Sequence, residues 1–465
     1  MTKFSVPRIL FLFALMGIIF FHSHIVIRNA MWILLSALSL FNFTFAVYSA
    51  FFYSAFFIPV GLFENPIFTL KHFHISIAIL IISLFIKGKL LHMVCRNCRR
   101  LMVLLPWLFI LAISTISAVF FQTHVVEALK MNANILSLVL GVVLLIVAIE
   151  NDKTAVMSVQ FFIGGVFFRM VLSILSFLKL KGYYPVENFL YNNHFAFLIC
   201  GALFLLLPFC LTYKQSAQKF IAWTTQILLF LGLLMGMSRT GYVSFFFGYI
   251  FFGFLLVKVF QTSDHLVSKR DLFRSLAVPV LIMLLIAGFL LIIFPIFTNL
   301  LPELQTGREF FDRLKGTTLV FVPLGWQQAF FDSEFRVNFG LFGHIRRDQF
   351  YVFAELIKHH WLTGVGLIHK VTDFHMLYLT LLGGSGVIGL SLFLFFCRQW
   401  LSALWRNLSS GSIEICVLRV GLLSSFFVWL CYSLMESFLI QFNIWAMIAL
   451  GIIFAQPFDK NASND

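Results

Sequence analysis

Long apolar runs alternate with short polar turns along most of the chain. A helix of about 20 apolar residues crosses a hydrocarbon core of about 30 Å, and backbone groups inside lipid must be paired within their own segment. The run at 31–60 is long enough for two short passes or one broken pass, so the pattern predicts an all-α polytopic membrane protein with about 12–14 helices. The predicted spans are 9–27, 31–60, 71–86, 101–121, 134–150, 156–178, 194–211, 220–237, 242–258, 275–298, 373–397, 416–434 and 437–455.

One long polar stretch, 299–372, interrupts this pattern. It mixes charges and glycines with Phe, Trp and Leu, which is unlike the composition of a disordered tail. Its part from Arg347 to His360 has helical spacing, with one face formed by Phe350, Phe353, Ala354 and Ile357. We therefore expect four regions: helices at 1–298, a large, partly helical loop at 299–372, helices at 373–456 and a polar tail at 457–465.

Composition agrees with a membrane protein. The chain is 61% hydrophobic and 11% charged, whereas soluble domains are about 45–50% apolar and about 25% charged. The formal net charge is +14, but the basic residues lie in short loops between apolar runs, which indicates membrane topology and not a nucleic-acid partner. The seven cysteines indicate no disulfide framework, and Cys95 and Cys98 form a lone CxxC pair.

The positions of Lys and Arg predict which loops share a side of the membrane. Loops rich in these residues face the cytoplasm, and here they are 87–100, 212–219, 258–274 and 398–415. Counting single crossings puts all four on one side. The turns near 122–133, 179–193 and 238–241 then lie with the long loop on the opposite side. The crossings within 31–60 leave the side of the N-terminus open.

The first candidate for chemistry is the outer turn Ser238-Arg239-Thr240-Gly241. A guanidinium has a fixed charge and a planar fork of donors that suits phosphate oxygens. The neighbouring hydroxyls and the start of the next helix, near Tyr242, add further donors. An interfacial arginine can instead extend to lipid headgroups, but Arg239 stands on the less positive side, which favours anion binding.

The second candidate is the adjacent pair Arg346 and Arg347 in the long loop. Two arginines on an amphipathic helix can complete an anion clamp, with Asp348 holding one of them. Alternatively, they pair with Glu334, Asp348 and Glu355 and only fold the loop. Spacing alone leaves both interpretations open.

The third candidate is His375, at the outer end of the predicted helix 373–397. Its unperturbed pKa of about 6.5 suits a general base, although a lone histidine among 13 is more often structural. Asn193 and His194, at the outer start of another predicted helix, can line the same cavity. No metal is expected, because the histidines near His375 lack ligand spacing; these are His359, His360 and His369.

At these residues the chain resembles the bacterial O-antigen ligase and O-antigen polymerase family of membrane glycosyltransferases. Order, sidedness and intervals agree over roughly 190–395. The matching residues are Ser238-Arg239-Thr240-Gly241, Arg347 with Tyr351 and Ala354, Trp361-Leu362-Thr363-Gly364-Val365-Gly366, and His375 with Leu379 and Gly386-Val387-Ile388-Gly389-Leu390. Trp361, Met376 and Gly384 depart from the family pattern, which affects the subtype more than membership.

The resemblance implies transfer of a glycan from undecaprenyl pyrophosphate to an acceptor hydroxyl at the periplasmic face of the bacterial inner membrane, with no cofactor or metal. Arg239 and Arg347, assisted by Arg346, would clamp the pyrophosphate, and His375 would accept the acceptor's proton. The acceptor is lipid A–core for a ligase, which the single arginine motif favours, or another lipid-linked glycan for a polymerase. Membrane lipids surround the site, and the supporting residues would be Ser238, Thr240, Tyr242, Tyr351, Asn193 and His194.

A polysaccharide transporter or flippase is the alternative from another class. It predicts charged or broken helices near mid-membrane and two related halves. The candidate buried charges are Arg169, Arg419 and Glu436, and no repeat is visible. The polar residues concentrate at one face, which favours chemistry at the membrane surface.

Overall fold

The computed structural model confirms an all-α polytopic membrane protein. Within its described residues, seven helices are long and apolar enough to cross a membrane, and three shorter apolar helices accompany them. The predicted spans 9–27 and 275–298 lie almost wholly outside those residues, so the total of about 12–14 helices stays a prediction. The described residues are 11–12, 34–40, 42–55, 63–64, 69–70, 72–86, 88, 90–122, 124–177, 193–235, 239–262, 277, 344–368, 376–434 and 442–456.

The predicted spans within these residues are helices, and one two-stranded hairpin joins the first two of them. The N-terminal elements are α3 (Phe43–Ala55), β1 (Phe63–Glu64), β2 (Thr69–Leu70), α4 (His72–Ile86), α5 (Leu90–Arg96), α6 (Cys98–Leu101), η1 (Met102–Leu104), α7 (Leu105–Phe120), α8 (Val125–Ala148) and α9 (Asp152–Phe177). The remaining elements are α10 (Asn193–Thr212), α11 (Ser216–Met235), α12 (Arg239–Thr262), α17 (His344–His360), α19 (Leu377–Arg406), α20 (Ile413–Ser433) and α21 (Phe442–Ala455).

Several helices begin earlier than the apolar runs predict. The structure starts α8 at Val125 and α9 at Asp152, whereas the predicted spans start at 134 and 156. The first turns of these helices carry Glu127 and Asp152. Acidic side chains stabilise a helix N-terminus but interrupt a hydrophobic pattern. A prediction based on hydrophobicity alone therefore starts both helices too late in the chain.

Helix α10 is buried along most of its length and has four other helices packed around it. All of its residues from 195 to 210 are buried, and it packs against α9, α11, α12 and α20. Small residues bring α10 and α20 close: Ser425 Oγ donates to the Gly201 carbonyl at 3.1 Å, and a Cβ on Gly421 would lie 2.5 Å from the Phe204 carbonyl oxygen. Small residues at such crossings are typical of membrane helices.

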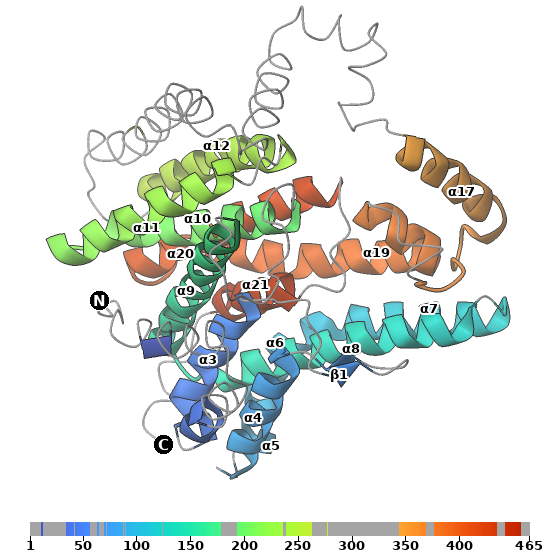
Figure 1. Cartoon of the computed structure of the whole chain (residues 1–465), viewed down its shortest axis with the longest axis horizontal. Helices are drawn as coiled ribbons and strands as arrows, with labels where there is room; N and C mark the ends of the chain where they lie inside the picture. Colours follow the sequence, from blue (N-terminus) through green and yellow to red (C-terminus); the bar gives the residue numbers. More distant parts are fainter. Residues whose placement is uncertain are drawn as a thin grey trace, which may run out of the picture.

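The other long helices form a second group beside this one (Figure 1). Helix α7 packs against α8 and α19, and α21 packs against α8 and α19. Helix α20 contacts both α10 and α21, so it joins the two groups. Figure 1 shows α17 at one side of the view, above the end of α7, and α17 packs against α19.

The described parts of the basic loops gather at one end of the bundle, as the charge pattern predicts. Arg100, from loop 87–100, donates to the carbonyl of Gln456 at 3.5 Å. Lys258 lies over the ring of Trp405, with its ammonium 3.9 Å from the ring centroid. The ends of α6, α12, α19 and α21 are therefore neighbours. That these ends face the cytoplasm stays a prediction, which rests on the positive-inside rule.

Arg419, on α20, ties two of these ends together. Its side chain is 3% exposed; Nε donates to the Phe454 carbonyl at 2.8 Å and one terminal nitrogen donates to the Asn407 carbonyl at 2.5 Å. The same nitrogen also donates to the carbonyl and the hydroxyl of Ser410. The charge predicted as a transport residue thus pairs carbonyls at the C-terminal ends of α19 and α21, where a cation is favoured.

We predict that Arg419→Leu lowers the free energy of unfolding by about 2–3 kcal/mol, because buried carbonyls lose their donors. The exposed Arg406 is the matched control, since its Nε bonds only the Ser402 carbonyl of its own helix, at 3.3 Å. Thermal unfolding in detergent measures both variants. Equal melting temperatures for Arg419→Leu and Arg406→Leu would contradict the role of Arg419.

Candidate functional site

Three helices begin close together at the end of the bundle opposite the basic loops. Near the start of α10, the ring of Phe197 lies 5.5 Å from that of Tyr432, at the end of α20. Near the start of α19, the Tyr378 hydroxyl donates to the Leu430 carbonyl of α20 at 3.3 Å. Near the start of α12, the Cys200 thiol of α10 donates to the Gly241 carbonyl at 3.5 Å. The starts of α10 and α19 therefore contact the last turn of α20, and the start of α12 lies against α10.

Several residues predicted to form the site lie at these helix starts. Asn193 and His194 are the first two residues of α10, and Arg239 and Thr240 are the first two of α12. Tyr242 is half-buried and packs against the hydrophobic core. The structure thus brings two of the predicted segments, which are about 45 residues apart in the chain, to one end of the bundle.

His375 and Ser238 lie outside the described residues, so their predicted roles are untested. His375 is two residues before Leu377, the first residue of α19, and Ser238 directly precedes α12. Their chain neighbours therefore begin helices that belong to this end of the bundle.

The electrostatics of this end favour an anion. Each helix N-terminus carries roughly +0.5 of an elementary charge from its aligned peptide dipoles and presents unpaired N–H groups. The starts of α10, α12 and α19 direct three such termini to one region. Arg239, as the first residue of α12, adds a formal positive charge at one of these helix termini.

Arg169 of α9 is a further cation at this end. Its side chain is 6% exposed, and its guanidinium carbon lies 5.0 Å from the ring centroid of Phe195, two residues after Asn193. The sequence identified Arg169 only as an isolated membrane charge that fits a transporter. Its proximity to α10 depends on the packing of two helices, which hydrophobic periodicity does not specify.

The predicted helix in the long loop is confirmed as α17, His344–His360. Its half-buried residues in the second half are Phe353, Leu356, Ile357 and His360, whereas Ala354 is exposed. Ala354 belongs to the predicted face but is exposed, whereas Leu356 and His360, which were not assigned to that face, are half-buried. Arg346, Arg347 and Tyr351 are on the other half of α17.

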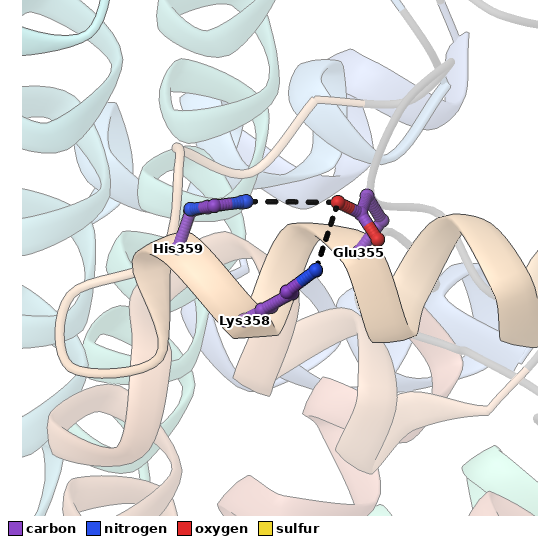
Figure 2. Close-up of polar contacts among 3 residues, drawn as sticks. All are labelled: Glu355, Lys358 and His359. Carbon is purple, nitrogen blue, oxygen red and sulfur yellow. Dashed lines mark ion pairs between the residues drawn. The ribbon is translucent and has the colours of Figure 1, made fainter.

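Glu355 bonds within α17, as Figure 2 shows. Its Oε1 lies 3.7 Å from Lys358 Nζ and 3.6 Å from His359 Nε2. These side chains are about two-thirds exposed, so the pairs contribute little to stability. Glu355 is thus engaged by partners other than the arginines proposed for it, whereas Glu334 lies outside the described residues. The predicted anion clamp by Arg346 and Arg347 stays untested.

The end of α17 packs on α7 through His360. Its ring centroid lies 4.3 Å from that of Phe121 in an edge-on arrangement. Arg346 and Arg347 stand about four helical turns before this contact. The structure therefore shows how the C-terminal end of α17 is attached, whereas the predicted place of its arginines beside the helix starts stays untested.

Helix α19 is broken at Gly386, where φ is +65° and ψ is −169°. The residues that follow α17 pair with both sides of the break. Val365 and Gly366 donate their N–H groups to the carbonyls of Gly383 and Gly384, at 3.0 and 2.9 Å. We call residues 361–367 the capping loop.

The capping loop also serves the second half of α19. Val387 and Ile388 donate to the carbonyls of Trp361 and Leu362, at 2.9 and 3.3 Å. Backbone groups that a break leaves unpaired are costly in an apolar environment. The capping loop therefore donates hydrogen bonds to the carbonyls before the break and accepts hydrogen bonds from the N–H groups after it.

Glycines allow this close approach. A Cβ on Gly386 would lie 2.1 Å from the Leu362 carbonyl oxygen, and one on Gly364 would lie 2.5 Å from the carbonyl carbon of Gly384. The resemblance includes these glycines among its matching residues, but the sequence does not identify what they contact. Gly386 contacts the capping loop, which holds another of the matching motifs.

Metal ligation finds no support among the described residues, which contain no cluster of three His, Cys, Asp or Glu side chains suited to an ion. His359 pairs with Glu355, and His360 packs on Phe121. His369 and His375 lie outside the described residues.

No protein-family model matches the chain, and comparison with curated proteins gives no significant match.

We predict that Gly386→Ala destabilises the protein by more than about 3 kcal/mol, because the methyl group meets backbone that cannot move away. Gly88 is the matched control: its φ is +62°, and nothing lies within 4 Å of a Cβ built there. Gly88→Ala costs only the left-handed backbone term of about 1–2 kcal/mol. Similar melting temperatures for the two variants would contradict the packing at Gly386.

Proposed function

We propose that this protein is a membrane glycosyltransferase of the O-antigen ligase type, which moves a glycan from undecaprenyl pyrophosphate to an acceptor hydroxyl. The observation that carries the proposal is the meeting of the starts of α10, α12 and α19 at one end of the bundle. The first residues of these three helices are Asn193, Arg239 and Leu377. Convergent helix N-termini suit a pyrophosphate, which carries the charge released in such a transfer.

The proposed reaction is a single displacement. The acceptor oxygen forms a bond to the anomeric carbon while the bond from that carbon to the pyrophosphate oxygen breaks. The bonding electrons leave with undecaprenyl pyrophosphate, and His375 takes the acceptor's proton. The configuration at the anomeric carbon inverts. Arg239 and Arg347, assisted by Arg346, neutralise the leaving group as its charge develops.

Arg169 extends this anion site in the proposal. A buried guanidinium is costly in a membrane and is retained mainly where it has a function or a partner. Its contact with Phe195 places it beside the first turn of α10. From there it adds positive potential to the region where α10 begins, without needing to bind the reacting sugar itself.

The break in α19 favours a second candidate, a transporter, because broken helices form the ion and substrate sites of many transporters. In this chain the capping loop engages the Gly383 and Gly384 carbonyls and the Val387 and Ile388 N–H groups. Those groups are the ones that a transport site at the break would present. Because these groups are paired with the capping loop, the break is better explained by a structural role. The transferase therefore stays the first candidate. Flux of a lipid-linked glycan across vesicles without a covalent product would reverse that order.

We predict that purified protein transfers a defined glycan from undecaprenyl pyrophosphate to an acceptor. His375→Ala should lower kcat about 100- to 10,000-fold, because it removes the general base. The rate of the unaltered protein should fall as pH drops below about 6.5, since a protonated imidazole cannot accept a proton. His359→Ala, on the exposed face of α17, is the matched control. Near-normal turnover by correctly folded His375→Ala would refute the base.

Arg239→Ala and Arg347→Ala should each lower kcat about 100- to 1,000-fold, because each removes a donor from the leaving pyrophosphate. Arg406→Ala, an exposed arginine at the opposite end, should leave the rate unchanged. Product length separates the subtypes. Transfer to lipid A–core identifies a ligase, and extension of a lipid-linked repeat identifies a polymerase.

Arg169→Met should lower kcat/KM for the lipid-linked donor about 10- to 100-fold, the range of one charge-assisted hydrogen bond. Arg169→Lys should retain more activity because it keeps the charge. Steady-state kinetics with varied donor measure both variants, with thermal unfolding as the check on folding. An unchanged kcat/KM in a stable Arg169→Met protein would exclude Arg169 from the donor site.

A further inference from the structure

A chain of buried hydrogen bonds joins α7 to α8. Asn132 of α8 accepts from the Ser114 hydroxyl at 3.0 Å and donates to Thr115 Oγ1 at 2.9 Å. Thr115 in turn donates to the Leu111 carbonyl at 2.8 Å. Ser114 and Asn132 are 0% and 6% exposed. The donors and acceptors run in one direction, so the contact fixes how the two helices face each other.

The chain continues into the capping loop. The N–H of Leu367 donates to Ser114 Oγ at 2.8 Å, and Ser117 Oγ donates to the Thr363 carbonyl at 3.0 Å. A Cβ on Gly366 would lie 2.6 Å from the Cβ of Ala118, so backbone and helix are in direct contact. The loop is therefore bonded on one side to α7 and on the other to the break in α19.

The capping loop also directly follows α17. The N–H of Gly364 donates to the His360 carbonyl at 2.8 Å, and the His360 ring packs on Phe121, at the end of α7. Helix α17 and the first half of α19 thus share one attachment. Helix α17 carries Arg346 and Arg347, and α19 begins two residues after His375.

We propose that Ser114, Ser117 and Asn132 are positioning residues, which hold the arginine helix and the histidine end of α19 in a fixed relation. This inference rests on the proposed transferase. Apolar side chains would pack α7 against α8 equally well, but only directed hydrogen bonds fix the loop in one register. The three residues act through the backbone of the capping loop and do not contact substrate.

Hydrogen–deuterium exchange tests the attachment without relying on activity. Ser114→Ala removes both the acceptor for Leu367 and the donor to Asn132. We expect peptides covering 361–368 and 383–388 to exchange about tenfold faster, the effect of losing roughly one net hydrogen bond. Peptides from α10 and α20 should be unchanged. Ser137→Ala is the matched control, because its hydroxyl bonds only the Asn134 carbonyl of α8, at 2.7 Å.

Transfer kinetics on the same proteins test the consequence. We expect kcat to fall about tenfold in Ser114→Ala and Asn132→Leu, with KM for the donor nearly unchanged, and Ser114→Thr to restore part of the loss. If Ser114→Ala also accelerates exchange in α10, Ser117→Ala, which loses only the Thr363 contact, replaces it.

Unchanged exchange at 361–368 in both serine variants overturns the inference. So does faster exchange with normal kcat, since the attachment would then not position anything the reaction needs. If exchange is faster in the variants but the unaltered protein transfers no glycan, the proposed transferase function is refuted. The hydrogen bonds to the capping loop then have only a structural role.

Discussion

The break in α19 at Gly386 is the constraint on which this end of the molecule depends. A helix interrupted within an apolar bundle exposes carbonyls on one side and N–H groups on the other, and neither can be left unpaired in lipid. The capping loop pairs with both sides. Because that loop leads directly from α17, the break also determines where the helix of the long loop lies. Glycine is required at the break because its backbone is left-handed and in contact with Leu362.

The second organising feature is electrostatic. The starts of α10 and α19 contact the last turn of α20, and the start of α12 lies against α10. Arg169 adds a buried charge beside the start of α10. The other end of the bundle collects helix C-termini, and Arg419 pairs with their carbonyls there. The two ends are thus distinct in chemistry as well as in position, with binding proposed at one and structural pairing found at the other.

The sequence predicted the described helices well, because they follow from local hydrophobicity. The side of the membrane that each loop faces was inferred from loop charge and stays a prediction. The sequence shortened α8 and α9, since acidic first turns stabilise a helix but break an apolar run. It matched the glycines after His375 to the family pattern, yet it did not identify their contact, the capping loop, which lies about 20 residues earlier in the chain. The same limit applies to Arg169, whose neighbour Phe195 belongs to another helix.

We infer that residues from three separate segments share one compartment at one end of the bundle. Single cysteines at 239, 347 and 375, in a cysteine-free background, test it by labelling with a membrane-impermeant thiol reagent from each side of oriented vesicles. A cysteine at 410, beside Arg419, reports the opposite end. We expect the cysteines at 239, 347 and 375 to be labelled from one side of the vesicle membrane, and the cysteine at 410 from the other. Labelling of 239 and 375 from opposite sides would contradict it.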